Sequence, residues 1–239
     1  GVAPVELSLS PAPPFPLLSD DLLVLDLSYP QVTALGDLQT PGWSPGQPTE
    51  GVRRFYRNVV VAHARPADLP DRWFGLEAVD VIVWDTPDPA ALSIAQRDAL
   101  SAWVRNGGQL VIGIGAAWSA LSKSDLAPIL PLAGEGATTT VQKLEVLFSR
   151  TASSEWKRRE FRDPIPVTLA RPAEGAFRTL GDFGPGNEPI SLITMRLVGS
   201  GRVVATAASL RDLTAAPLDK DKFFAALFDL NAYSEEFAK

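Results

Sequence analysis

The stretch of sequence that decides the fold is SIAQRDALSAWVRNGGQLVIGIG, residues 93–115. Its first part predicts an amphipathic helix over 93–108, because Ser93 and Gln96 form a capping box and apolar residues recur at helical spacing behind them. The asparagine and two glycines at the end of that helix favour the left-handed conformation that stops it. The remainder, QLVIGIG at 109–115, is a continuous apolar run, which is typical of a strand buried on both faces of a parallel sheet.

Three earlier apolar runs have the same character. We expect strands at 22–27 (LLVLDL), 58–64 (NVVVAHA) and 79–86 (VDVIVWDT), and the first and third of these hold an aspartate near their end. The third run, the helix and the strand at 109–115 complete a strand–helix–strand unit of about 30 residues. Such units build parallel sheets, so the sequence predicts an α/β fold.

After residue 135 the sequence becomes rich in strands of the antiparallel kind. Segment 138–150 alternates in part between polar and apolar residues, as a half-exposed strand does. We expect further strands at 164–170, 190–198 and 202–210, and an amphipathic helix at 219–233. Gly199-Ser200-Gly201 suits a hairpin turn between the last two strands.

Proline content separates the start of the chain from the rest. Residues 1–20 hold five prolines, so we interpret them as a linker or a strap over the surface. Residues 21–239 are expected to form a single domain, in which the β-rich portion 136–210 feeds back into the sheet. Residues 37–51 are rich in glycine and proline and predict a long loop.

The composition excludes several kinds of site. The 239-residue chain has no cysteine and one histidine, His63, which rules out disulfides, thiolate metal sites, a cysteine nucleophile and a multi-histidine metal site. A net charge of −6 argues against a broad nucleic-acid surface. We therefore expect no metal, no cofactor and no nucleic-acid partner. No apolar run of about 18 residues occurs, and the chain starts at Gly1 rather than Met, so membrane contact is expected only through a segment that this chain lacks.

Four features occur together: a first strand that ends at Asp26, WDTPDP at 84–89, WVRNGGQLVIGIG at 103–115 and SGRVVATAASL at 200–210. This combination resembles the glutamine amidotransferase-like superfamily, and most of all its non-catalytic branch from bacterial membrane-associated proteins. The resemblance is carried by the spacing D-x-P…L-S-x-x-Q-x-x-A-L-x-x-W-V-x-x-G-G-x-L-V-x-x-G, which residues from Asp85 to Gly115 follow closely. It covers residues 20–130 and, loosely, the C-terminal strand. It implies an α/β fold with a flavodoxin-like three-layer parallel sheet, to which the strand patterns after residue 135 add an antiparallel, β-rich C-terminal portion.

Catalytic members of that superfamily carry a cysteine within G-I-C-x-G-x-Q, on a sharp turn where backbone amides stabilise an oxyanion. When this pattern is laid on residues 113–119, the cysteine position is Gly115. Because the chain has no cysteine, the Cys–His–Glu relay of the family cannot be assembled and amidotransferase activity is excluded. The resemblance therefore implies a degenerate domain that binds without catalysing.

We place the candidate site at the carboxyl edge of the predicted sheet, where open parallel sheets bind ligands. The residues of this sheet-edge pocket follow three of the predicted strands: Asp26, Ser28, Tyr29, Asp85, Thr86, Gly115, Ala116 and Trp118. The two carboxylates could act as acid and base or hold a divalent cation, or they could cap the turns that follow them. The two aromatic rings could stack on a sugar or peptide, or lie partly buried under the loop.

Two weaker patterns remain. Ser119, with His63 as base and Asp26 or Asp85 as orienting acid, has the residue types of a serine hydrolase. No G-x-S-x-G elbow accompanies it, and the simpler interpretation is a first-turn helix residue and a structural histidine. The basic cluster at 157–162 could contact a phosphate, whereas the acidic residues interleaved with it favour a solvated surface.

The sequence thus predicts a non-enzymatic domain that binds a small molecule or a protein partner. We expect it to be the soluble part of a larger membrane-associated or exported bacterial protein, with a periplasmic or membrane-anchored extracytoplasmic location favoured over the cytoplasm. One alternative is a hydrolase that uses Asp26 and Asp85, with or without a divalent metal. Another is a structural interaction module whose β-rich half, 138–210, pairs with a neighbouring chain along an exposed strand edge.

Overall fold

The computed structural model describes residues 21–38, 59–151, 160–216 and 218–228. The proline-rich segment 1–20, most of the predicted loop 37–51 and half of the basic cluster 157–162 lie outside these ranges. Within them, no helix combines the length and the apolar character needed to cross a membrane.

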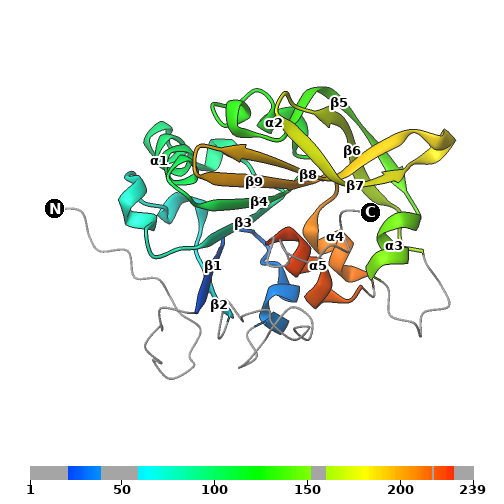
Figure 1. Ribbon diagram of the computed structural model, residues 1–239, viewed down its shortest axis with the longest axis horizontal. Coiled ribbons are helices and arrows are strands. Elements are labelled where there is room, and N and C mark those ends of the chain that lie inside the picture. The colour runs from blue at the N-terminus through cyan, green and yellow to red at the C-terminus, as the bar shows by residue number, and fades with distance from the viewer. Residues whose placement is uncertain (1–20, 39–58, 152–159, 217, 229–239) are drawn as a thin grey trace.

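A seven-stranded sheet with the order β2-β1-β3-β4-β9-β8-β7 forms the centre of the described part of the chain (Figure 1). Its strands are β1 (Leu22–Asp26), β2 (Val59–His63), β3 (Val81–Asp85), β4 (Gln109–Gly113), β7 (Ala176–Phe183), β8 (Pro189–Val198) and β9 (Gly201–Thr206). Neighbouring strands from β2 to β9 are parallel, whereas β8 and β7 join antiparallel. Every residue of β1, β3 and β4 is buried, as continuous apolar runs in a parallel sheet require.

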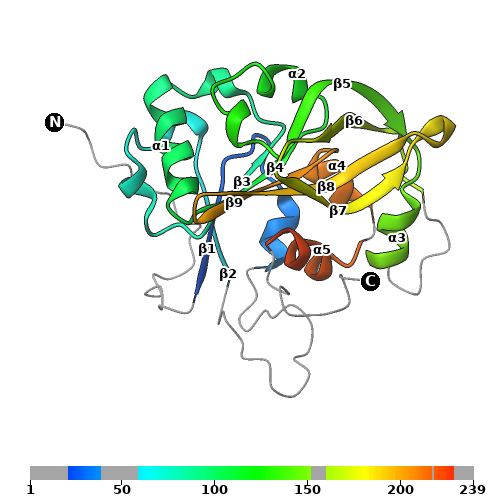
Figure 2. The same cartoon turned by 45° about the horizontal axis from the view of Figure 1, so that its top comes forward.

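Helices cover both faces of this sheet (Figure 2). On one face lie α1 (Ile94–Arg105) and α2 (Trp118–Leu121), and on the other lie α3 (Glu145–Thr151), α4 (Leu210–Ala215) and α5 (Lys220–Leu227). Alternate residues of β1 enter two separate apolar clusters: Leu23 and Leu25 pack with α1, whereas Leu22 and Val24 pack with α5. The described part of the chain therefore has three layers with the sheet in the middle.

Two kinds of smaller element complete the structure. A second, antiparallel sheet pairs β5 (Leu132–Val141) with β6 (Ile165–Pro172), and a bridge between Val167 and Ala208 links it to the segment after β9. The short 3-10 helices are η1 (Thr33–Leu38), η2 (Pro66–Asp68), η3 (Trp73–Leu76), η4 (Pro89–Ala91), η5 (Ala127–Ile129) and η6 (Pro185–Asn187).

The predicted α/β fold, with a mostly parallel sheet and antiparallel strands towards the C-terminus, is confirmed. The capping box of α1 forms in both directions: Ser93 Oγ accepts from Gln96 N at 3.2 Å, and Gln96 Oε1 accepts from Ser93 N at 2.8 Å. The backbone after α1 turns at Gly107, whose φ is 121°. The predicted hairpin between 190–198 and 202–210 is present as β8 and β9.

The predicted strand at 138–150 is wrong beyond Val141, because α3 begins at Glu145. The β-branched residues before Val141 do form the end of β5. The residues after it become helical because the carboxylate of Asp182, in β7, accepts from Val146 N at 3.0 Å and from Leu147 N at 3.1 Å. These are amides of the first helical turn, which have no partner inside the helix itself. A cap supplied from a distant strand leaves no local pattern.

The predicted strand at 202–210 is also too long. β9 ends at Thr206, and the side chain of Ser209 caps α4, a helix that was not predicted from the sequence. Strand β7 was missed as well. The helix predicted at 219–233 is present as α5, and its residues beyond 228 lie outside the described ranges.

Candidate functional site

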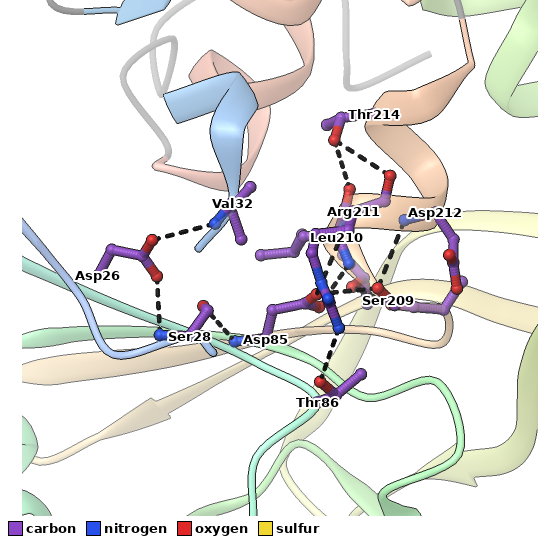
Figure 3. A network of polar contacts seen from close by, with 12 residues as sticks. Asp26, Ser28, Val32, Asp85, Thr86, Ser209, Leu210, Arg211, Asp212 and Thr214 are labelled. Carbon is purple, nitrogen blue, oxygen red and sulfur yellow. Dashed lines mark hydrogen bonds and ion pairs between the residues drawn. The ribbon is translucent and has the colours of Figure 1, made fainter. Parts of the chain in front are cut away.

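Asp26, at the end of β1, is buried, and its carboxylate holds the loop that follows the strand (Figure 3). Oδ1 accepts from Ser28 N at 2.9 Å, and Oδ2 accepts from Val32 N at 3.1 Å. Oδ2 also lies 3.2 Å from Nδ1 of His63, which ends the neighbouring strand β2. The Asp26 carboxylate therefore joins two strands and one loop at the carboxyl edge of the sheet.

Asp85, at the end of β3, occupies the N-terminal end of α4 (Figure 3). Its side chain is 0% exposed, and its oxygens accept from Ser209 Oγ at 2.8 Å, from Leu210 N at 2.6 Å and from Arg211 Nε at 2.9 Å. A buried carboxylate is costly unless such partners surround it. The Asp85 side chain is therefore an anchor for the start of α4 and does not face solvent.

Ser28 connects the two aspartates, and Thr86 connects the end of β3 to Gly113 and Arg211. Ser28 Oγ accepts from Asp85 N at 2.9 Å, which ties the loop after β1 to the end of β3. Thr86 has a φ of 45°, a left-handed conformation that β-branched residues rarely adopt. Its backbone N–H donates to Gly113 O at 2.7 Å, and its hydroxyl accepts from Arg211 Nη2 at 3.3 Å. These bonds offset the backbone strain, which for such a residue costs on the order of 1–3 kcal/mol.

Gly115 belongs to the same cluster. Its φ is 52°, and a Cβ placed there would lie 3.3 Å from Ser209 N and 3.7 Å from the methyl group of Thr86. Its carbonyl accepts from the hydroxyl of Thr168, in β6. The structure therefore brings five of the predicted site residues to one edge of the sheet, namely Asp26, Ser28, Asp85, Thr86 and Gly115.

The other three predicted site residues are placed differently. Tyr29 is 90% exposed and precedes Pro30 through a cis peptide bond, and Ala116 is exposed as well. Trp118 is only 2% exposed, and its indole N–H donates to Gly134 O at 3.0 Å. The ring of Trp118 therefore packs in the apolar cluster on the α1 face of the sheet.

The serine hydrolase alternative is only half assembled. His63 contacts Asp26, as an oriented base would. Ser119, however, is an exposed residue of α2, and among the residues that the structure describes no hydrogen bond joins it to His63. Metal-ligating side chains are also scattered: no group of three or more His, Asp or Glu residues in the described ranges could hold a metal ion.

The residues that complete this edge were not among those predicted from the sequence. Ser209, Leu210 and Arg211 supply most of the partners of Asp85. The first two belong to the segment 202–210 that was predicted as strand, and Arg211 follows it directly. One signal could have found them. Ser209-x-x-Asp212 matches the pattern with which helices begin, and Ser209 Oγ does accept from Asp212 N at 3.4 Å.

Asp212 lies beside this cluster, and its pKa responds to the charges of Asp85 and Arg211. Burial raises the pKa of Asp212, the carboxylate of Asp85 raises it further, and the guanidinium of Arg211 acts in the opposite direction. A carboxyl group whose pKa is higher in the folded state contributes stability in its protonated form, and this contribution is lost as the pH rises through that pKa. Helix α4 has only six residues, so its dipole does little to stabilise the negative charge of Asp212 in the first turn.

We therefore expect Asp212→Asn to be more stable than the wild type at pH 7, by up to about 1 kcal/mol after solvent screening. The difference should shrink as the pH is lowered towards 4. Urea denaturation of both proteins across this pH range measures it. A variant that is less stable than the wild type at pH 7 contradicts this account of Asp212.

Comparison with known proteins finds solved structures of similar fold and assigns no function to this chain. No family model matches the chain, and no curated protein matches it. Among solved structures, the chain is similar to the cytoplasmic protein STM3548 of Salmonella typhimurium, with 14% identity, a TM-score of 0.56 and coverage of 86% of this chain and 97% of that one. It is also similar to the cytoplasmic protein STM1381 of Salmonella typhimurium LT2, with 12% identity, a TM-score of 0.57 and coverage of 87% and 99%.

A β-galactosidase from Bacillus circulans sp. alkalophilus also matches, with 11% identity and a TM-score of 0.50. The match covers 89% of this chain and 31% of the β-galactosidase, so the likeness concerns one part of that enzyme. At these identities the three structures share a fold with this chain and carry no information on its activity.

These matches correct the resemblance inferred from the sequence. Two of the matching structures are the Salmonella proteins, and nothing in the matches points to the glutamine amidotransferase-like superfamily. The predicted membership of that superfamily is therefore wrong. They also lend no support to membrane association. The motif from Asp85 to Gly115 did not identify the family because it encodes only a capped helix, a glycine turn and a buried strand. A parallel α/β sheet needs these elements whatever its family, and the chain is similar to solved α/β proteins through its fold alone.

Proposed function

We propose that this chain is a non-enzymatic domain that binds a ligand or partner. We also propose that the polar residues at the carboxyl edge of its sheet have a structural role, in which they hold strands, a loop and α4 together. One observation carries the proposal: the Asp85 carboxylate is buried and holds Ser209, Leu210 and Arg211 at the start of α4. A general acid or base, or a metal ligand, has to reach its substrate or ion directly. Asp85 could do so only by releasing the start of that helix.

We further propose that the sheet is of the flavodoxin-like type. The parallel order β2-β1-β3-β4-β9 supports this, because it is the 2-1-3-4-5 order of that fold when β9 counts as the fifth strand. In that fold, ligands bind where the strand order reverses, which here is the carboxyl edge between β1 and β3. Asp26, Ser28 and Asp85 fill this position with hydrogen bonds to one another and to the backbone.

A structural interaction module is the second candidate, and one feature favours it. Strand β7 pairs with β8 at one end of the sheet order, and it exposes 46% of Phe177 and 56% of Phe183. Unpaired strand edges with apolar side chains are templates for another chain. The ladder between β7 and β8 has two register shifts, and such irregularities make an edge harder to extend.

A turnover screen tests the non-enzymatic proposal against the hydrolase alternative. The 239-residue chain is incubated with a panel of esters, glycosides and phosphoesters, with and without Mg²⁺ or Mn²⁺. We expect no rate above that of the buffer, because neither buried carboxylate is available to a substrate. The proposal fails if a rate appears that is lost in Asp85→Asn and kept in Asp88→Asn, which alters an exposed cap close by. Circular dichroism confirms that both variants are folded.

A further inference from the structure

A cavity of about 520 Å³ lies at the opposite, amino edge of the sheet. Its floor is formed where β1, β3, β4 and β9 begin, and its walls come from the segment 73–80, the turn after α1 and the turn between β8 and β9. A volume of this size suits a small molecule. None of the site residues predicted from the sequence lines it.

Three side chains that line this cavity donate hydrogen bonds to other groups of the protein. Gln109 Nε2 donates to Leu227 O at 2.7 Å, and Arg202 Nη2 donates to Phe228 O at 2.9 Å and to Gln109 Oε1 at 2.8 Å. These bonds fix the C-terminal end of α5, where backbone carbonyls need external partners. Asn106 Nδ2 likewise donates to Ala102 O at 2.8 Å, at the end of α1.

Two of the side-chain acceptors that line the cavity are carboxylates. Glu77 and Asp80 both line it, and within the described part of the chain neither forms an ion pair. Asp80 Oδ2 accepts from Leu23 N at 2.8 Å, and burial raises the pKa of Asp80 despite that bond. Trp73, which is 38% exposed, adds an aromatic ring to the same wall.

We propose that this cavity binds a small organic cation with a substituted ammonium group, with Glu77 and Asp80 supplying the opposite charge and Trp73 the aromatic face. An aromatic ring attracts such a cation through its quadrupole, and a partly desolvated carboxylate gains a counter-charge when the cation binds. The guanidinium of Arg202, which lines the same cavity, donates to a side-chain amide and a backbone carbonyl, and in the described ranges no ion pair joins it to either carboxylate. A neutral ligand would therefore leave Glu77 and Asp80 without a counter-charge. This inference rests on the proposed binding role and gives that role a site and a ligand class.

Choline and its neutral isostere 3,3-dimethylbutan-1-ol provide the test, because they differ in charge and hardly in shape. Isothermal titration of the 239-residue chain is expected to show saturable choline binding at one site. Binding of the isostere should be weaker by roughly tenfold or more, since it loses both the ionic and the cation–π attraction. Asp80→Asn, Glu77→Gln and Trp73→Ala should each weaken choline binding by roughly fivefold or more.

Glu174→Gln is the matched control, because it removes an exposed carboxylate from the turn between β6 and β7, which does not line the cavity. Its choline affinity should equal that of the wild type. Phosphatidylcholine vesicles, tested by co-sedimentation, separate a free cation from a lipid headgroup, and we expect no sedimentation with them. Circular dichroism shows whether each variant is folded.

Three results would overturn the inference: no saturable choline binding, equal affinity for the isostere, or vesicle binding that excess choline does not displace. An unchanged affinity in folded Asp80→Asn and Glu77→Gln would overturn it as well. None of these results touches the proposed absence of catalysis, which the turnover screen tests at Asp85. The two proposals can therefore fail separately.

Discussion

Asp85→Ala is expected to lower the free energy of unfolding by about 3 kcal/mol, because it leaves buried hydrogen-bond donors without an acceptor. The buried donors are the hydroxyl of Ser209 and the backbone N–H of Leu210. Arg211 contributes less to the loss, since its side chain is 35% exposed and can turn to water. Urea denaturation followed by circular dichroism measures the change.

Asp88→Ala is the matched control for this substitution. Asp88 lies three residues away, is exposed, and accepts one hydrogen bond, from Ala90 N at 2.9 Å. Removing an exposed cap of this kind costs about 1 kcal/mol or less. If Asp85→Ala proves no more destabilising than Asp88→Ala, then Asp85 is not the anchor of α4, and the case for a structural carboxyl edge is lost.

Gly113→Ala is expected to destabilise the protein by about 2 to 3 kcal/mol, because the new methyl group has no room. A Cβ at this position would lie 2.8 Å from Leu210 N and 2.9 Å from Leu210 Cγ, and closer still to Oδ1 of Asp85. The backbone of Leu210 can move only if the start of α4 moves with it. Thermal and urea denaturation both report this loss.

Gly36→Ala and a double variant sharpen this second prediction. A Cβ at Gly36, in η1, would meet nothing within 4 Å, so its replacement should leave stability nearly unchanged. In the Asp85→Ala background, Gly113→Ala should cost less than it does alone, because the atom it meets first is gone. Strict additivity of the two substitutions would mean that Gly113 and Asp85 do not press against each other.

The strands and the longest helix could be predicted because their information is local. Continuous apolar runs mark β1, β3 and β4, all of whose residues are buried, and the capping box marks the start of α1. The start of α3 could not be found in this way, and the local pattern Ser209-x-x-Asp212 at the start of α4 was overlooked. Asp85 and Asp182 cap these helices from strands far away in the sequence.

The candidate site shows the same division. The sequence identified Asp26 and Asp85 as polar residues at the ends of buried strands, and the structure places both at one edge. Their use depends on which groups surround them. Backbone amides and Arg211 surround Asp85, whereas the carboxylates of Glu77 and Asp80 line a cavity at the opposite edge that no sequence motif indicated.

By itself, the sequence determined the fold class and removed whole kinds of chemistry, because periodicity and the lack of cysteine are properties of the chain alone. Only the tertiary structure decided which carboxylates are buried and hydrogen-bonded within the protein and which line a cavity. The hydrogen-bond partners of these carboxylates lie far away in the sequence, as Leu210 does from Asp85 and Leu23 from Asp80, and they come close only once the sheet has formed.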